Sequence, residues 1–135
     1  MDYFDRHRLK VVAFLEEFLR SKRRSYARIN SWGPDALDKL GPYIQTGKML
    51  RSGLVAVGAG TGRRPPAAAV VQAGAAIELI QAALLIHDDI IDRDEMRRGK
   101  PSLHHEYALR GRTLGTRDPV HFGEGMGICL ADIAF

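Results

Sequence analysis

The chain has 135 residues, 45% of them hydrophobic, which is enough for one domain with a buried core and too few to expect two. Its 20 Lys and Arg residues outnumber its 16 Asp and Glu residues, and the resulting net charge of +4 favours anionic partners such as phosphates. Cys129 is the only cysteine, which excludes a disulfide framework and a cysteine-based zinc site within the chain, so a reducing, cytoplasmic location is expected.

The first predicted element is an amphipathic helix over residues 3–20, where apolar residues recur at close to helical spacing. A basic run without acids follows over residues 20–28 and is typical of a solvated helix end. Glycine-proline pairs at 33–34 and 41–42 are turn signals, so we expect them to bracket a short helix. Another helix is expected over residues 49–57.

The longest predicted helix starts after the prolines at positions 65 and 66 and runs from residue 67 to about residue 96. Its apolar part, residues 67–86, is as long as a membrane span, but Gln72, Glu78 and Gln81 interrupt it. We therefore expect a buried central helix and no stable membrane insertion.

Residues 108–119 contain two glycines, a proline and several charges, which predicts a connector or mobile loop. A last helix is expected from near Phe122 to Phe135. No alternating pattern typical of strands appears, so the predicted class is all-α. The chain ends in an apolar stretch without a capping glycine, which suggests a single domain that is the incomplete amino-terminal part of a longer one.

The stretch "LLIHDDIIDRDEMRRGK" over residues 84–100 gathers carboxylates at the end of this apolar helix. In a helix, Asp88 and Asp92 are one turn, or about 6 Å, apart along the axis and share a face, with Asp89 beside them. Carboxylates this close repel each other unless a cation joins them. Mg²⁺ fits, because it prefers oxygen ligands and completes its shell with water and substrate phosphate.

The cations that follow these acids suit phosphate oxygens. Arg97 and Arg98 can grip phosphate through the guanidinium fork, and Lys100 adds charge. A solvated salt-bridge cluster is the alternative. The helix face behind the acids turns apolar through Leu84, with Gln81 on the same face, which favours a substrate with a diphosphate head and a hydrocarbon tail.

A second cationic element, "GKMLR", places Lys48 and Arg51 three residues apart on one helical face behind a glycine. It is not a phosphate-binding P-loop, because the glycine spacing is wrong and Met49 stands where Ser or Thr is required. Taken alone, such a pair is more often surface charge than a ligand-binding element.

Together, "GKMLR", "HDDIIDRDEMRRGKPSLH" and "HFGEGMGICLADIAF" resemble the trans-isoprenyl (polyprenyl) diphosphate synthases over residues 47–135. This resemblance implies an isoprenoid-synthase helical bundle whose long central helix ends in a DDxxD motif. It also implies an Mg²⁺-dependent enzyme that couples an allylic diphosphate to isopentenyl diphosphate head to tail. We further expect a homodimer and no nucleic-acid partner.

The resemblance also implies roles for individual residues. The expected metal ligands are Asp88 and Asp92, and Asp89 would assist them as a third catalytic acid. Arg97, also counted as catalytic, would contact the allylic diphosphate. The residues expected to bind isopentenyl diphosphate are Lys48, Arg51, Gln81 and Arg98. Those expected to set product length are Ala83 and Leu84.

The chain departs from the family pattern in three places. Ser52 replaces the proline that commonly follows the arginine, and Ala131 precedes Asp132 where glycine is usual. The second aspartate-rich motif of the family would lie beyond Phe135, so we expect these 135 residues alone to be inactive. The alternative functions are a class I terpene cyclase and a non-catalytic partner subunit of a complete synthase.

Overall fold

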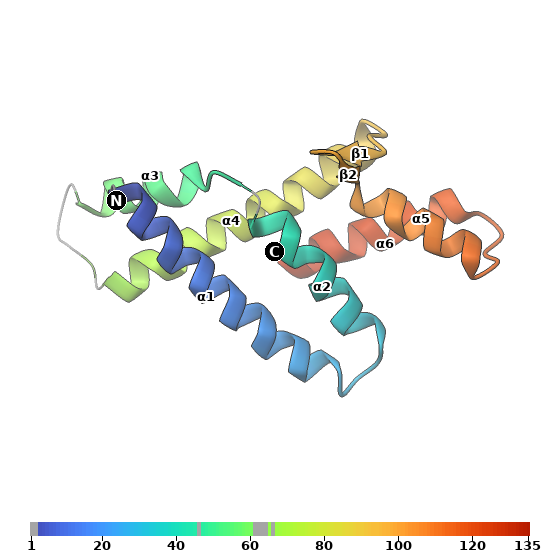
Figure 1. Cartoon of the computed structure of the whole chain (residues 1–135), viewed down its shortest axis with the longest axis horizontal. Coiled ribbons are helices and arrows are strands. Elements are labelled where there is room, and N and C mark those ends of the chain that lie inside the picture. The colour runs from blue at the N-terminus through green and yellow to red at the C-terminus, as the bar shows by residue number, and fades with distance from the viewer. Residues whose placement is uncertain (1–2, 46, 61–64, 66) are drawn as a thin grey trace. The chain divides into compact units, whose positions relative to one another are not determined.

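The computed structural model describes residues 3–45, 47–60, 65 and 67–135. These residues form helices and one short hairpin, which confirms the all-α prediction (Figure 1). The elements are α1 Tyr3–Tyr26, α2 Trp32–Gln45, α3 Leu50–Gly60, α4 Ala67–Ile91, β1 Met96–Arg97, β2 Lys100–Pro101, α5 Leu103–Thr113 and α6 Pro119–Ala134. They group into two compact units, Met1–Leu79 and Ile80–Phe135, each described below by itself. The expectation of a single domain stays a prediction.

In the first unit, α1 and α2 form an antiparallel pair (Figure 1). Each of the two helices buries a set of apolar residues. Buried residues of α1 recur every fourth position, as one helical face requires, and they are His7, Val11, Leu15 and Leu19. The helix continues through the basic run to Tyr26, beyond the predicted end at residue 20. At the edge of the pair, Arg23 donates to both carboxylate oxygens of Asp38 at 2.7 and 2.9 Å, which lowers the pKa of that carboxyl.

The start of α2 is fixed by Asn30, whose side-chain oxygen accepts hydrogen bonds at 3.0 Å from the N–H groups of Trp32 and Gly33. The prediction that the glycine-proline pairs at 33–34 and 41–42 bracket this helix is wrong at both ends, since α2 starts at Trp32, passes through Pro42 and ends at Gln45. Pro42 cannot donate a helical hydrogen bond, yet the helix continues past it and buries Ile44 in the same turn.

Helices α1, α3 and α4 approach closely at Gly74 of α4. A Cβ atom there would lie 3.0 Å from Cβ of Ser52, 3.2 Å from Nε2 of His7 and 3.3 Å from Cγ2 of Val11. Glycine therefore sits inside the long helix because a side chain would separate it from two neighbours. The prolines predicted to start the helix precede Ala67, and Pro66 lies outside the described residues.

Among the described residues, α4 is the helix long and apolar enough to cross a membrane by length and composition alone. Only a third of the residues in its most apolar stretch are buried, whereas the sequence predicts that this central helix is buried. Inside this apolar stretch, Glu78 is 7% exposed, and at its end Asp89 is 1% exposed.

In the second unit, α4 ends at Ile91, five residues before the predicted end. Arg93 has a left-handed backbone, with φ of 58°, and its N–H donates to the carbonyl of Ile90 at 3.3 Å. The N–H of Asp94 donates to the carbonyl of Asp89 at 2.9 Å. This pair of bonds is a Schellman motif, which stops the helix and turns the chain away from its axis.

A small hairpin begins at residue 96, where the predicted helix was expected to end. Strands β1 and β2 are antiparallel, and Arg97 pairs with Lys100. The two residues between them, Arg98 and Gly99, have φ values of 52° and 78°, as a type I′ turn requires. The sequence showed no strand signal because the ladder is only two residues long on each side.

The prediction of a connector over residues 108–119 is wrong for the first half of that segment, because α5 runs to Thr113. Gly111, which suggested a loop, is a packing residue: a Cβ there would lie 2.9 Å from Phe122 Cδ1. The helix ends at a second Schellman motif, with φ of 69° at Gly115. Helix α6 starts at Pro119, three residues before the predicted Phe122.

Helices α5 and α6 lie side by side, joined by this short turn (Figure 1). A Cβ at Gly123 would lie 2.3 Å from the carbonyl oxygen of His104 and 2.7 Å from the backbone nitrogen of Ala108. A Cβ at Gly127 would lie 2.9 Å from Cδ1 of Ile90 on α4. Glycines one turn apart thus let α6 contact the backbone of α5 and the end of α4.

Candidate functional site

The carboxylates of the DDIID stretch separate into two environments. Asp88 and Asp92 are exposed, and the N–H of Asp92 donates to the carbonyl of Asp88 at 2.8 Å, so helical geometry extends to Asp92. The two residues therefore lie one turn apart on one face, as predicted. Asp89 is 1% exposed and lies away from that face.

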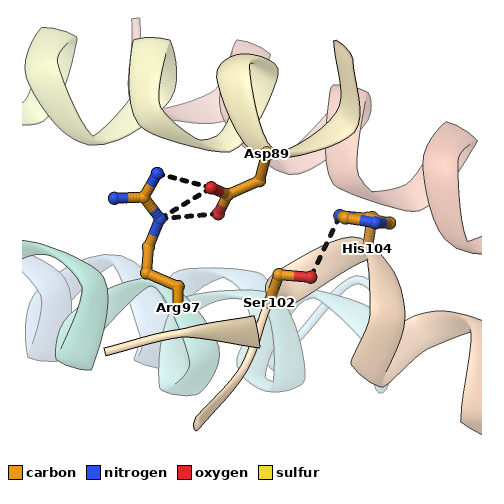
Figure 2. Close-up of polar contacts among 4 residues, drawn as sticks. All are labelled: Asp89, Arg97, Ser102 and His104. Carbon is orange, nitrogen blue, oxygen red and sulfur yellow. Dashed lines mark hydrogen bonds and ion pairs between the residues drawn. The ribbon is translucent and has the colours of Figure 1, made fainter. Parts of the chain in front are cut away.

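Asp89 is paired with Arg97 of the hairpin (Figure 2). Nε of Arg97 donates to both carboxylate oxygens at 2.7 Å, and a second guanidinium nitrogen also donates to Oδ1. The Arg97 side chain is 25% exposed and that of Asp89 is 2% exposed. The contact therefore ties the first hairpin strand to the last turn of α4 through a largely dry, charge-assisted interaction.

A second polar contact lies at the start of α5. Ser102 Oγ and His104 Nδ1 are 3.2 Å apart, and both residues are buried (Figure 2). Burial lowers the pKa of His104 below its ordinary value, and the nearby charge of Asp89 opposes this only in part. A neutral imidazole is thus favoured, and its contact with Ser102 helps to hold the residue before α5 in place.

The other predicted cations of the hairpin face solvent. Arg98 and Lys100 are both exposed, and Arg98 occupies the first position of the type I′ turn. Their position next to the Asp89–Arg97 pair places positive charge on a constrained loop at the end of α4. Such charge is suited to phosphate oxygens.

Lys48 and Arg51 belong to the first unit, at the start of α3, and both are exposed. Met49 between them has a left-handed backbone with φ of 51°, and its carbonyl accepts bonds from Ser52 Oγ at 2.9 Å and from the Gly53 N–H at 3.2 Å. Leu50 is therefore the first helical residue, with Arg51 in the first turn and Lys48 just before it.

The first turn of α3 has a partner on α4 that the sequence did not reveal. The N–H of Ser52 donates to Oε1 of Glu78 at 2.9 Å, and both residues are buried. In the sequence, Glu78 only interrupts the apolar pattern of a predicted helix. A single carboxylate inside such a stretch is itself a signal, because a buried charge needs a hydrogen-bonding partner.

The remaining predicted residues lie along the second-unit part of α4. Gln81 is half-buried, Ala83 is fully buried and Leu84 is 46% exposed, so the two product-length candidates differ in their surroundings. On the same helix, Nε2 of His87 lies 4.0 Å from Oδ1 of Asp132 on α6. The roles assigned to these residues stay predictions.

The described residues contain no group of three or more His, Cys, Asp or Glu side chains arranged to hold a metal ion. The exposed pair of Asp88 and Asp92 nevertheless fits Mg²⁺, which commonly takes one or two protein carboxylates and fills its other positions with water and substrate phosphate. Asp89 suits that role less well in this arrangement, because both of its oxygens accept bonds from Arg97.

A pocket of about 610 Å³ lies elsewhere, in the first unit, among residues of α1, α3 and α4. Its lining includes Arg6 and Lys10 but none of the residues predicted to bind substrate or metal. The candidate site is thus defined by exposed charged side chains at helix ends, and not by this pocket.

The sequence model of the polyprenyl synthetase family matches residues 34–130. The chain belongs to this family. The matched range contains every residue predicted for the site, from Lys48 to Arg98, and both polar contacts of Figure 2.

Relatives and a solved structure agree with this assignment. Nonaprenyl diphosphate synthase of Mycobacterium tuberculosis is 44% identical over 91 residues, which cover 67% of this chain and 26% of that protein. Short chain isoprenyl diphosphate synthase of Methanothermobacter thermautotrophicus is 37% identical over 131 residues, which cover 94% of this chain and 35% of that protein.

A crystal structure of geranylgeranyl pyrophosphate synthase from Corynebacterium glutamicum, complexed with isoprenyl diphosphate and magnesium, matches with a TM-score of 0.82 and 32% identity. The match covers 99% of this chain and 39% of that one, which confirms the expected isoprenyl-synthase fold. The chain thus spans about a quarter to two fifths of the length of these proteins. Their names differ in product length, so the comparisons do not choose a product.

Proposed function

We propose that the protein is a trans-prenyltransferase that condenses an allylic diphosphate with isopentenyl diphosphate to make a longer polyprenyl diphosphate. Family membership supports this class of reaction. The observation that carries the proposal is the exposed pair of Asp88 and Asp92, one turn apart at the end of the apolar helix α4. A charged site at the end of an apolar helix suits a substrate with a diphosphate head and a hydrocarbon tail.

In this proposal Asp88 and Asp92 hold Mg²⁺, which when bound neutralises charge on the leaving diphosphate. Arg97 contacts the allylic diphosphate, and Asp89 fixes the direction of its planar guanidinium. A guanidinium held in this way loses little side-chain entropy when it binds phosphate.

The second substrate uses the other cations. Lys48 and Arg51 bind isopentenyl diphosphate from the start of α3, together with Gln81 and Arg98. The family resemblance further supports a homodimer. The single cysteine supports a reducing, cytoplasmic location, and no nucleic-acid partner is proposed. Product length remains assigned to the region of Ala83 and Leu84.

The test uses the protein expressed from its complete reading frame, with labelled isopentenyl diphosphate, farnesyl diphosphate and Mg²⁺. We expect label to enter a longer prenyl diphosphate and chelation of Mg²⁺ to stop the reaction. Replacing Asp88 or Asp92 with Asn should lower kcat about a hundredfold, because each change removes a charged metal ligand.

Asp94→Asn is the matched control, since Asp94 is an exposed acid two residues beyond the pair and should leave the rate close to that of the wild type. Absence of label in any longer product would contradict the proposal. Conversion of the allylic diphosphate to cyclic products would instead indicate a terpene cyclase. Activity only with a second, complete synthase would indicate a partner subunit.

A further inference from the structure

The start of α3 is joined to α4 by one buried hydrogen bond between residues 26 positions apart in the sequence. The donor is the Ser52 N–H and the acceptor is Glu78 Oε1, at 2.9 Å. Ser52 is 0% exposed and Glu78 is 7% exposed, so water does not compete effectively for either group. Both residues lie in the first unit.

This bond satisfies two requirements at once. Ser52 is the third helical residue of α3, and N–H groups of a first turn have no partner within the helix. Glu78 is a carboxylate in an apolar helix and needs a donor. A carboxylate at a helix amino terminus also interacts favourably with the helix dipole, so Glu78 acts as a cap supplied from another helix.

The capped turn carries the two cations assigned to isopentenyl diphosphate. Lys48 and Arg51 lie on either side of Met49, which has a left-handed backbone and a carbonyl that accepts two hydrogen bonds. These features define where the helix begins. A helix end without such bonds frays, and both side chains would then sample more positions. The direction of these cations therefore depends on what holds Ser52.

We propose that Glu78 is a positioning residue for the second substrate: its carboxylate holds the Ser52 N–H and thereby fixes the first turn of α3, from which Lys48 and Arg51 bind isopentenyl diphosphate. The inference rests on the proposed function of that pair. In this proposal Glu78 itself contacts no substrate, and the Ser52 N–H that it accepts is unavailable to a diphosphate. The isopentenyl diphosphate is therefore recognised by the cationic side chains and not by this amide.

The experiment compares steady-state kinetics of the protein from its complete reading frame with those of Glu78→Leu and Glu78→Gln. We expect Glu78→Leu to raise the KM for isopentenyl diphosphate about tenfold, the usual size of a lost charge-assisted hydrogen bond, with kcat and the allylic KM nearly unchanged. Glu78→Gln keeps an acceptor oxygen and should recover most of this loss. Gln72→Leu, an exposed change on the same helix, is the control and should change neither KM.

The same bond can be tested from its other end if Glu78→Leu does not fold. Ser52→Pro removes the N–H and the hydroxyl, whereas Ser52→Ala removes only the hydroxyl. Proline is tolerated in a first turn because no intrahelical bond is lost there. Proline also fixes the backbone of this turn without an acceptor and is the common residue here in the family, so we expect Ser52→Pro and Ser52→Ala to keep an isopentenyl KM near that of the wild type. Adding Glu78→Leu to Ser52→Pro should leave that KM unchanged, because no N–H of Ser52 then lacks its acceptor.

The outcomes separate the inference from the function on which it rests. Equal losses in kcat and both KM values for Glu78→Leu and Glu78→Gln would show a general stabilising role and overturn the positioning role. A higher isopentenyl KM in Ser52→Pro combined with Glu78→Leu than in Ser52→Pro alone would do the same, because Glu78 would then act without the Ser52 N–H. A wild-type protein that consumes no isopentenyl diphosphate would overturn the proposed function, and the inference with it.

Discussion

Asp89 shows how one residue of a charged motif can differ from its neighbours. Of the three aspartates between residues 88 and 92, it is the buried one, and its carboxylate is neutralised by Arg97. A buried ion pair contributes little net stability compared with apolar residues, but removing one partner leaves an isolated charge in a dry site. The buried position of Asp89 within the motif therefore depends on Arg97 as its charge partner.

We predict that Arg97→Gln lowers the free energy of unfolding by about 3 kcal/mol, because it leaves the Asp89 carboxylate buried without its cation. Urea denaturation monitored by circular dichroism measures this. Lys100→Gln removes an exposed cation from the same hairpin and should change stability by less than about 0.5 kcal/mol. Equal effects of the two substitutions would show that the Asp89–Arg97 pair is not required for stability.

His104 gives the folded protein a predictable response to acid. Because burial lowers its pKa, the unfolded chain takes up a proton at a higher pH than the folded protein does. Stability from the neutral imidazole is fully present above the unfolded value of about 6.5 and is lost as the pH falls below it toward the lowered pKa.

We predict that the stability lost between pH 7.5 and pH 5.5 is smaller in His104→Asn than in the wild type, since asparagine keeps a polar atom near Ser102 but does not titrate. Urea unfolding at the two pH values measures the difference. Thr113→Ala, at an exposed position of the same helix that carries no titratable group, should keep the wild-type pH dependence. An unchanged acid response in His104→Asn would assign it to other groups.

At the scale of elements, α5 and α6 depend on glycine at particular positions. Gly123 faces the backbone of α5, whereas a Cβ at Gly125, two residues on, would meet no atom within 4 Å. The same substitution at these two positions of one helix should therefore have opposite effects. The change at Gly123 measures the effect of close packing on stability, whereas the change at Gly125 measures the effect of helix propensity alone.

We predict that Gly123→Ala lowers the free energy of unfolding by about 3 kcal/mol, because its methyl group would overlap the carbonyl of His104. Gly125→Ala should raise it by up to about 1 kcal/mol, since alanine restricts the unfolded chain and favours the helix. Thermal and urea unfolding of both variants give the comparison. Stabilisation by both substitutions would mean that α5 and α6 do not pack through Gly123.

These glycines also explain which elements could be predicted. Apolar periodicity correctly located α1 and α4, because each repeats its pattern over many turns. It failed for α5, where Gly111 suggested a loop although it packs against Phe122. It also failed at the end of α4, because Arg93 takes a left-handed backbone that usually favours glycine. The identity of a residue does not reveal whether that residue is required by the local backbone or by packing against a distant segment.

For the whole molecule, the same distinction applies to the candidate site. Asp88 and Asp92 were identified from the sequence because their relation is local, one turn of one helix. The pairing of Arg97 with Asp89 required the hairpin to fold back, and the contact between Glu78 and Ser52 joins positions 26 apart. Spacing rules therefore find candidate residues that share one element, whereas contacts such as Asp89–Arg97 and Glu78–Ser52 are found only when distant segments are seen together.

Helix α4 has a consequence for how the protein loses its structure. It contributes Gly74 and Glu78 to the first unit and Asp89 and Ile90 to the second. Opening of either unit would leave about a dozen helical residues without packing, a length that is marginal as an isolated helix in water. A partly unfolded state with one unit intact is therefore not expected to be stable. The amide hydrogens of the two units should exchange with solvent in one cooperative opening.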